Sequence, residues 1–464
     1  MLSALHDVIK AISAFLYQPW FVPLILLIGG FCFTIRSRFI QVRCLGEAFR
    51  VVLEKPEKAG RISSFGALMV STASRVGTGN IIGVSMAICL GGPGALFWMW
   101  LAAFFGMATK FSEGCLAVKF RQVDDQGNIA GGPMYYIEMG LGKKWKPLAI
   151  AFALFGIMTA MLGSGTTTQM NAIVSSVNAG FGVSTYITCA IVTILVAIIT
   201  FGGLQSISKT ASKIVPAMAV IYFIITVIFL IMNASEVPHA VSQVITGAFN
   251  GTAAAGGFAG AGLMLTIRSG IARGLYSNES GLGSAPIVAA AAKTKWPAEQ
   301  GLISMTGTFI DTIIICTLTG LTIIVSGVWT GTTNGAEMTQ SAFATTYGSL
   351  APFILTISLT LFAFTTIIGW NYYGERCWEY LFGTKTIKLY RIGYIAILAS
   401  AVFLKLEAIW SLADIVNGLM AIPNLIALLG LSGVITAETK KYFNHLAIRD
   451  AKLKAYKARR IGKK

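Results

Sequence analysis

The stretch from Ser71 to Gly106 constrains this chain more than any other. It is apolar on both sides of its middle, as a membrane helix would be, but its centre holds Gly77, Thr78, Gly79 and Asn80. In hydrocarbon, a broken backbone survives only where protein buries it or where it lines a wet cavity, because unpaired N–H and C=O groups are costly there. The sequence therefore predicts a membrane helix that breaks at a binding site.

A second reading of the same glycines is close helix packing. Gly79 and Gly83 have the small-xxx-small spacing that lets two membrane helices approach each other. Packing alone does not require the polar residues Thr78 and Asn80 inside the glycine cluster, or Arg75 one turn before it. We therefore favour a binding site at this break.

Composition places the whole chain in a bilayer. Of the 464 residues, 55% are hydrophobic and only 12% are charged, against about 25% charged in an ordinary soluble domain. Apolar stretches of membrane-spanning length recur along the chain. We predict an all-α polytopic membrane protein with about eleven spans, near residues 18–36, 64–90, 95–118, 148–175, 185–203, 212–232, 244–273, 301–328, 351–374, 391–409 and 413–436.

The basic residues predict the orientation. Most of the 36 Lys and Arg residues lie in alternate loops and in the C-terminal tail, whereas the opposite loops hold only Lys10 and Lys405. By the positive-inside rule, the N-terminus is outside and the C-terminus is cytoplasmic, in a multi-pass protein of the cell membrane. The same distribution argues against nucleic-acid binding, because the basic residues are not interleaved with aromatic residues on a soluble module. We read no removable signal peptide at the N-terminus.

Cysteine and histidine usage argues against a disulfide framework or a zinc site. The seven cysteines form no CxxC pair, and the three histidines are widely separated. No phosphate-binding G-x-x-x-x-G-K-[ST] motif occurs either, so ATP-driven transport lacks its phosphate cradle. We expect no organic cofactor.

The ten spans after the first divide into two sets of five. The second span breaks near Gly77, and the seventh carries a comparable glycine-rich interruption at Ala253 to Gly262. Interruptions at matching positions of two halves indicate inverted repeats with a site at the bilayer midplane. We predict an N-terminal helix and basic loop (1–62), two five-helix repeats (63–235 and 236–438) and a basic tail (439–464).

Two facing breaks would bind a zwitterion. We expect the N–H groups of Thr78 and Gly79, at the positive end of a half-helix, to bind a carboxylate, with Asn80 in the same site. Carbonyls near Gly256, Gly257 and Phe258 would accept an ammonium group.

An acidic residue lies inside the eighth span. Asp311 is a functional candidate because intramembrane carboxylates are costly. It either neutralises Arg75 or joins Asn80 in a second cation or proton site.

Other polar residues in the spans are site candidates. The fourth span carries a polar run from Thr166 to Asn171, and its Gln169 would reach polar groups of a substrate. Trp370, followed by Asn371, is either an interfacial anchor or a pocket wall that favours small side chains by steric exclusion. The remaining charged candidates are Glu279 with Arg273 and Arg268, expected on a cytoplasmic loop as an inner-gate network, and Lys110 with Glu113, expected as a local pair.

Several motifs resemble a known family. The segment GGPGALFWMW at 91–100, followed by LAAFFG, is similar to the signature of the alanine or glycine:cation symporters, the sodium:alanine symporter family. The segment SRVGTGN at 74–80 resembles the first broken helix of the leucine-transporter fold. Further similar segments are GGFAGAG at 256–262, RGLYSNESGLGSAP at 273–286 and FIDT at 309–312.

The resemblance implies a sodium site and supports a glutamine at position 169 in the substrate site. The carbonyls of Ala73 and Val76 and the hydroxyls of Thr365 and Thr366 would coordinate Na⁺, although a Thr pair inside a helix also back-bonds to the preceding turn. The leading prediction is a secondary symporter that imports alanine or glycine with Na⁺ by alternating access. Proton coupling is the alternative, and a membrane-embedded enzyme is less favoured because neither HExxH nor a Ser/His/Asp set is visible. The oligomeric state stays open.

Overall fold

The computed structural model describes residues 11–18, 20–54, 61–125, 127–250, 259–330, 335–403 and 406–461, and these are almost entirely helical. The short hairpin β1–β2 is the one sheet of this described part. The elements are α2 Val22–Arg36, α3 Ile40–Arg43, α4 Leu45–Leu53, α5 Ser64–Arg75, α6 Val84–Gly91, α7 Gly94–Lys119, β1 Gln122–Val123, β2 Ile129–Ala130, α8 Pro133–Tyr136, α9 Lys146–Leu162, α10 Thr167–Phe181, α11 Thr185–Phe201, α12 Gly203–Met232, α13 Val237–Asn250, α14 Ala259–Asn278, α15 Ala285–Ala289, α16 Pro297–Thr308, α17 Thr317–Val325, α18 Gly335–Tyr347, α19 Ala351–Phe382, α20 Ile387–Ser400, α21 Leu406–Gly430 and α22 Ser432–Ile461.

Length and hydropathy identify the membrane-spanning helices. In the described part of the chain, seven helical segments are long and apolar enough to cross a bilayer, or eight when a bent pair is counted as one span. The helices α2 and α11 are apolar but shorter. The predicted all-α polytopic fold is confirmed, and the total of eleven spans stays a prediction.

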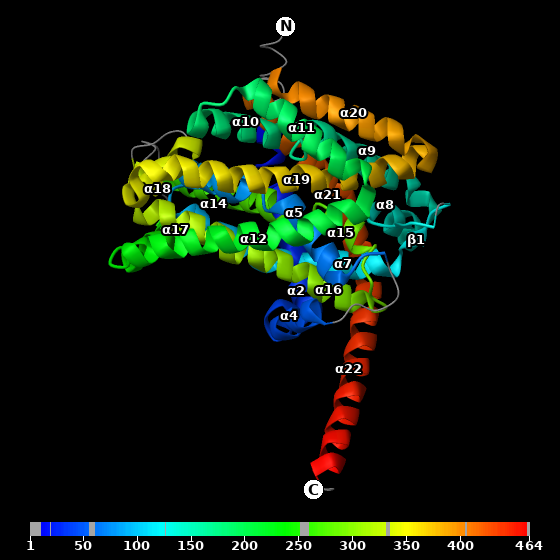
Figure 1. Cartoon of the computed structure of the whole chain (residues 1–464). Helices are drawn as coiled ribbons and strands as arrows, with labels where there is room; N and C mark the ends of the chain where they lie inside the picture. Colours follow the sequence, from blue (N-terminus) through cyan, green and yellow to red (C-terminus); the bar gives the residue numbers. More distant parts are fainter. Residues whose placement is uncertain are drawn as a thin grey trace.

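The long helix α19 runs through the middle of the molecule, with α5 close to it (Figure 1). The two helices approach so closely that a Cβ added at Gly369 of α19 would lie 2.2 Å from the Ser74 hydroxyl oxygen of α5. Glycine at this position is therefore required by the packing. The C-terminal helix α22 leaves the body of the molecule and extends away from it (Figure 1).

The predicted break in the second span is confirmed. Helix α5 ends at Arg75, and the chain resumes as one π-helical segment, Gly79–Gly83, that continues into α6. The two halves are bent by 55° relative to each other. A second π-helical segment, Phe309–Cys316, joins α16 to α17. Segments of this kind are rare and often mark functional sites.

Two further breaks differ from the predicted spans. The fourth span was predicted as one helix over 148–175, but it breaks at 163–166, between α9 and α10. The chain also leaves helix at 279–284, between α14 and α15, where Gly281 and Gly283 have φ values of +90° and +81° that favour glycine. We had predicted this polar segment as a cytoplasmic loop, because it precedes several basic residues.

The predicted interruption of the seventh span at Ala253 to Gly262 lies mostly outside the described residues. Its described part, 259–262, is the first turn of α14 and is helical. The break that lies next to the break of the second span is the one at 279–284, as the contacts below show.

Candidate functional site

The backbone N–H groups of the break after α5 lie close together in the interior of the protein. The N–H of Gly77 donates to Asn80 Oδ1 at 3.0 Å, and the N–H of Thr78 donates to Gln169 Oε1 at 3.3 Å. The other end of the Gln169 amide donates to the Ser164 carbonyl at 3.0 Å, across the α9–α10 break. The structure therefore brings the predicted residues Thr78 and Gln169 together, and it joins two helix breaks.

The glycines of this break do not share one packing role. A Cβ on Gly79 would lie 3.0 Å from the ring of Tyr276 and 3.3 Å from the Cα of Ser277, so α14 packs closely there. A Cβ on Gly83 would meet nothing within 4 Å. Close packing against α14 therefore explains why residue 79 is a glycine, but it does not explain the glycine at position 83.

Asn80 and Asp311 join the π-helical segments Gly79–Gly83 and Phe309–Cys316. Asn80 Nδ2 donates to Asp311 Oδ1 at 2.8 Å and to Ser277 Oγ at 3.0 Å. The second carboxylate oxygen of Asp311 accepts from the hydroxyls of Ser277 and Thr312, both at 2.8 Å. All of these side chains are buried. The groups that donate to Asp311 are thus uncharged, and its carboxylate and the Ser277 and Thr312 hydroxyls supply oxygen atoms of the kind that a small hard cation requires.

Arg75 does not form the ion pair with Asp311 that we considered. Its Nε donates to the Ser71 carbonyl at 2.9 Å, and its two terminal nitrogens have no hydrogen-bond partner. The side chain is 3% exposed and packs against Gly307, where no Cβ would fit. Asp311 is hydrogen-bonded to Asn80 instead, and its role as a cation or proton site stays a prediction.

A buried charge cluster lies beside the site. Lys110 pairs with Glu113 at 3.2 Å, as predicted, and its Nζ also donates to the Glu279 carbonyl at 2.7 Å. Arg75 lies within electrostatic range of Lys110, Glu279 and Asp311. These groups are two positive and three negative side chains, an excess of one negative charge when all are ionised. A bound cation or proton would neutralise it.

The predicted inner-gate network of Glu279 with arginines is wrong. Glu279 is 3% exposed and lies in the α14–α15 break, not on a loop surface. Arg273 pairs with Asp414 at 2.9 Å instead. The carboxylate of Glu279 accepts from Trp370 Nε1 at 2.9 Å and from the Ser284 hydroxyl at 2.5 Å.

Backbone carbonyls converge on the hydroxyl of Thr366. This hydroxyl lies 3.1 Å from the Ala73 carbonyl, 3.5 Å from that of Val76 and 3.0 Å from that of Phe362. The neighbouring Thr365 faces Met218 Sδ at 3.6 Å and back-bonds to Phe362. The structure therefore brings Thr366 to the predicted carbonyls and leaves Thr365 apart from them. Its bond to the Phe362 carbonyl, four residues earlier on the same helix, is the back-bond to the preceding turn that was the alternative for this Thr pair.

Trp370 is buried rather than interfacial. It lies one turn after Thr366 on α19 and is 1% exposed. A Cβ on Gly165, in the α9–α10 break, would lie 2.8 Å from the Cβ of Trp370. The adjacent Asn371 is also buried, and its side-chain amide has no hydrogen-bond partner.

The predicted residues Gly257 and Phe258, with Gly256, lie outside the described residues. In their place, the last turn of α14 reaches Gly79 through Tyr276 and Ser277. Sequence analysis missed these two residues and Glu279 as site residues. A signal was present in the polar, glycine-containing run Asn278 to Ser284, which resembles the composition of the break near Gly77.

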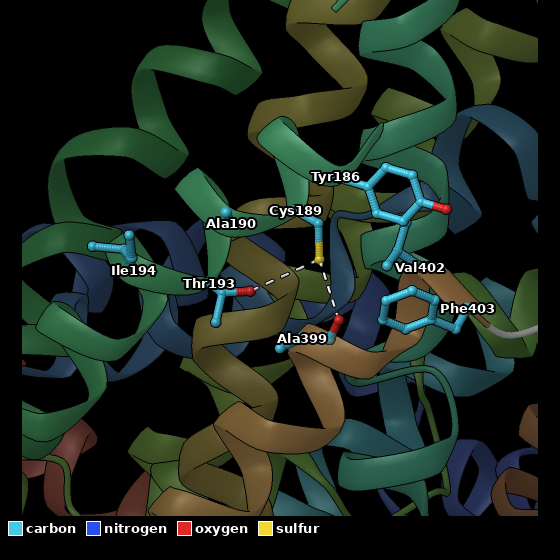
Figure 2. Close-up of a pocket in the computed structure, with 8 residues that line it drawn as sticks. All are labelled: Tyr186, Cys189, Ala190, Thr193, Ile194, Ala399, Val402 and Phe403. Atoms are coloured by element: carbon cyan, nitrogen blue, oxygen red, sulfur yellow. Dashed lines mark hydrogen bonds between the residues drawn. The ribbon is translucent and has the colours of Figure 1, made fainter. Parts of the chain in front are cut away.

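A separate pocket of about 300 Å³ lies between α11 and the end of α20 (Figure 2). Its lining is mostly apolar, and Cys189 Sγ contacts the Thr193 hydroxyl at 4.0 Å and the Ala399 carbonyl at 3.5 Å. None of the predicted site residues lines it. The lining residues are Tyr186, Cys189, Ala190, Thr193, Ile194, Ala399, Val402 and Phe403.

Comparison with known proteins agrees with this geometry. The model of the sodium:alanine symporter family matches residues 2–456. An uncharacterized transporter of Haemophilus influenzae is 50% identical over 450 residues, which cover 96% of this chain and 97% of that protein. The sodium/alanine symporter AgcS of Methanococcus maripaludis is 45% identical over 459 residues, which cover 96% of this chain and 99% of that protein.

A solved structure shares the fold. The crystal structure of MhsT in complex with L-phenylalanine superposes with a TM-score of 0.57 at 13% identity, covering 83% of this chain and 93% of that chain. This likeness concerns the fold alone, and it confirms the expected leucine-transporter type. The family model and the relatives show that the chain belongs to the sodium:alanine symporter family, whose members are transporters and not enzymes.

Proposed function

We propose that this protein imports a small neutral amino acid, alanine or glycine, together with Na⁺ by alternating access. Membership of the sodium:alanine symporter family supports Na⁺-coupled amino-acid symport. The observation that carries the proposal is the contact of the helix break near residue 77 with the break near residue 165, through Gln169, and with the last turn of α14, just before the break at 279–284. Broken helices expose backbone dipoles, which bind a zwitterion and a cation without a fixed charge.

The substrate carboxylate binds at the break after α5. Its ligands are the N–H groups of Thr78 and Gly79, at the start of the π-helical segment that continues into α6. Gln169 Oε1 accepts the Thr78 N–H in the structure described here, and it would turn away to admit the carboxylate. The ammonium group lies toward the last turn of α14, near Ser277, because the final carbonyls of a helix have no intrahelical partners. Gly257 and Phe258 stay a prediction.

One sodium ion binds among the carbonyls around Thr366. Na⁺ is a hard cation that needs oxygen ligands in place of its hydration shell. The carbonyls of Ala73, Val76 and Phe362 and the hydroxyl of Thr366 offer four such oxygens within a few ångströms of one another. Because α5 and α19 supply them from opposite sides, ion binding would hold the two helices together.

Asp311 forms a second cation site with Asn80. The carboxylate accepts three hydrogen bonds from neutral groups and has no ion-pair partner in the described residues. The buried charge cluster carries one excess negative charge when ionised, so a cation at this site is electrostatically favoured. A proton would neutralise the same charge, which keeps proton coupling as the second candidate.

We retain the predicted orientation and repeat organisation as part of this proposal. The C-terminal end with its basic helix α22 is cytoplasmic, and the N-terminus is outside. The two repeats span 63–235 and 236–438. The first repeat contains the break near Gly77 and the second contains the break at 279–284, which places one break in an early helix of each repeat.

Uptake into proteoliposomes tests the function directly. Radiolabelled alanine and glycine are offered with a Na⁺ gradient and a pH gradient imposed separately. We expect uptake above the equilibrium level with the Na⁺ gradient alone. Concentrative uptake that follows the pH gradient and ignores Na⁺ would establish proton coupling instead, and uptake that never exceeds equilibrium would reduce the protein to a uniporter.

A further inference from the structure

The indole of Trp370 lies between two of the helix breaks. Its Cβ end packs against Gly165 in the α9–α10 break, so closely that Gly165 has no room for a side chain. Its Nε1 end donates to the carboxylate of Glu279 in the α14–α15 break. Trp370 also follows Thr366 by one helical turn, so it lies on the face of α19 that meets the α5–α6 break. The ring therefore bounds the region where the breaks meet.

Glu279 is fixed more firmly than its partner. Its second carboxylate oxygen accepts from the Ser284 hydroxyl, and its own carbonyl accepts from Lys110. Its φ of +54° is unusual for a residue other than glycine, asparagine or aspartate, and the surrounding bonds hold it there. In the described residues, no Lys or Arg nitrogen lies within 4.0 Å of this carboxylate. Its contacts are thus those of a hydrogen-bond acceptor aimed at the indole.

From these contacts we infer that Glu279 is a positioning residue that sets the size limit of the substrate by holding the indole of Trp370 in place. The inference rests on the proposed function and deepens it. The bond from Nε1 to Glu279 at 2.9 Å holds the indole in its present orientation, while its Cβ packs against Gly165. Without the tether, the ring is free to turn away, and the site admits a larger side chain.

The expected change in the ratio of alanine to leucine uptake can be estimated from the selectivity of hydrophobic pockets in general. One methylene changes discrimination by about 10- to 200-fold when a pocket wall is rigid. A wall that moves loses that discrimination, so the ratio of alanine to leucine uptake should fall by about tenfold or more when the tether is removed. Uptake of alanine itself should change less than the ratio, because alanine does not reach the displaced ring.

The test uses four single variants and one double variant of the full chain in proteoliposomes. Trp370→Phe keeps an aromatic ring and removes the N–H, and Glu279→Leu removes the acceptor at similar volume. Glu279→Gln keeps an acceptor oxygen and removes the charge. Trp100→Phe is the control, since Trp100 Nε1 makes a comparable 2.8 Å bond to Thr317 away from the breaks. Uptake is measured for glycine, alanine, valine and leucine.

We expect Glu279→Leu to lower the alanine-to-leucine ratio and Trp370→Phe to lower it at least as far, because Phe is also smaller than Trp. Their double variant should lower the ratio no further than Trp370→Phe alone, since both remove the same bond. The alanine-to-leucine ratio of Glu279→Gln should stay within about twofold of the wild-type ratio, and that of Trp100→Phe should equal the wild-type ratio. An unchanged ratio in Trp370→Phe overturns the inference, even if Glu279→Leu does not fold. A change in Glu279→Gln as large as in Glu279→Leu also overturns it, because charge would then be the cause.

The test separates this inference from the proposed substrate. Each uptake ratio compares the best substrate of the wild type with a larger amino acid. The test therefore does not require alanine to be that best substrate. A wild type that prefers a larger amino acid contradicts the proposed function, while a shift of its size limit in Glu279→Leu that Glu279→Gln does not share still supports the role of Glu279.

Discussion

The side-chain oxygen of Gln169 accepts a hydrogen bond from the backbone N–H of Thr78 at 3.3 Å. This bond joins the middle of the α5–α6 break to α10, just after a second break. It also occupies the donor that we assign to the carboxylate of the substrate. Gln169 is therefore both a stabiliser of the break and a competitor for its donor.

Gln169→Glu should weaken substrate binding strongly. The new carboxylate would accept the Thr78 N–H as a charge-assisted bond, which is roughly twice as strong as a neutral one, and it would repel the substrate carboxylate. We expect the KM for alanine to rise by about tenfold or more, with a smaller change in the maximal rate. Initial uptake rates over a range of alanine concentrations measure this.

The control for this variant is Gln243→Glu on α13, where the side chain contacts His239 outside the site. It makes the same charge change and should leave the KM unchanged. A Gln169→Glu variant with normal alanine affinity would place the carboxylate site elsewhere.

Gly77→Ala should abolish transport, whereas Gly83→Ala should not. A Cβ on Gly77 would lie 2.4 Å from Thr366 Oγ1 and 3.2 Å from Gln169 Oε1, so it would displace both. A Cβ on Gly83 meets nothing within 4 Å. Both glycines belong to the same broken span, so the pair separates a local clash from the general effect of replacing a helical glycine by alanine, which changes stability by only about 0.5–1 kcal/mol. Uptake per amount of folded protein is the measurement, and equal losses in both variants would contradict the assignment.

The sequence predicted those parts of the site that show locally. Thr78, Gln169, Asp311 and Trp370 are polar or bulky residues inside apolar stretches, and a membrane makes such residues conspicuous because burying them is costly. The break near Gly77 showed in the same way. Hydropathy marked these positions as candidates, the family resemblance added support for Gln169, and their roles in a site stay predictions.

The missed parts depend on contacts that no local pattern records. The run from Asn278 to Ser284 resembles any polar loop until Lys110 and Glu113, far away in the sequence, are seen to bury it. Thr365 and Thr366 differ by about 100° of helix rotation, so only packing decides which one faces Ala73. A buried polar break and an exposed polar loop have similar composition, and they differ in what covers them.

Thr366→Ala should lower the affinity for Na⁺, and Thr365→Ala provides its matched control. The hydroxyl of Thr366 is the one that approaches the Ala73 and Val76 carbonyls, whereas that of Thr365 faces Met218. Loss of one oxygen ligand should raise the Na⁺ concentration for half-maximal uptake by about tenfold in Thr366→Ala. Thr365→Ala should change it by less than about threefold. Alanine uptake at a series of Na⁺ concentrations distinguishes them, and equal effects would mean that both hydroxyls serve the ion.

Asp311→Asn should weaken the coupling of transport to its driving ion. The substitution keeps the size of the side chain and removes the negative charge that a cation at Asn80 and Asp311 would neutralise. We expect the Na⁺ concentration for half-maximal alanine uptake to rise by about tenfold or more, since the carboxylate is the one charged oxygen ligand of this site.

Asp414→Asn is the control: it also removes a buried carboxylate, but one that pairs with Arg273 at 2.9 Å. That variant should lower the yield of folded protein and leave the Na⁺ dependence unchanged. If Asp311 binds a proton instead, Asp311→Asn will lose the response to a pH gradient and keep its response to Na⁺. Unchanged dependence on both ions would remove Asp311 from the coupling mechanism and leave it a structural partner of Asn80.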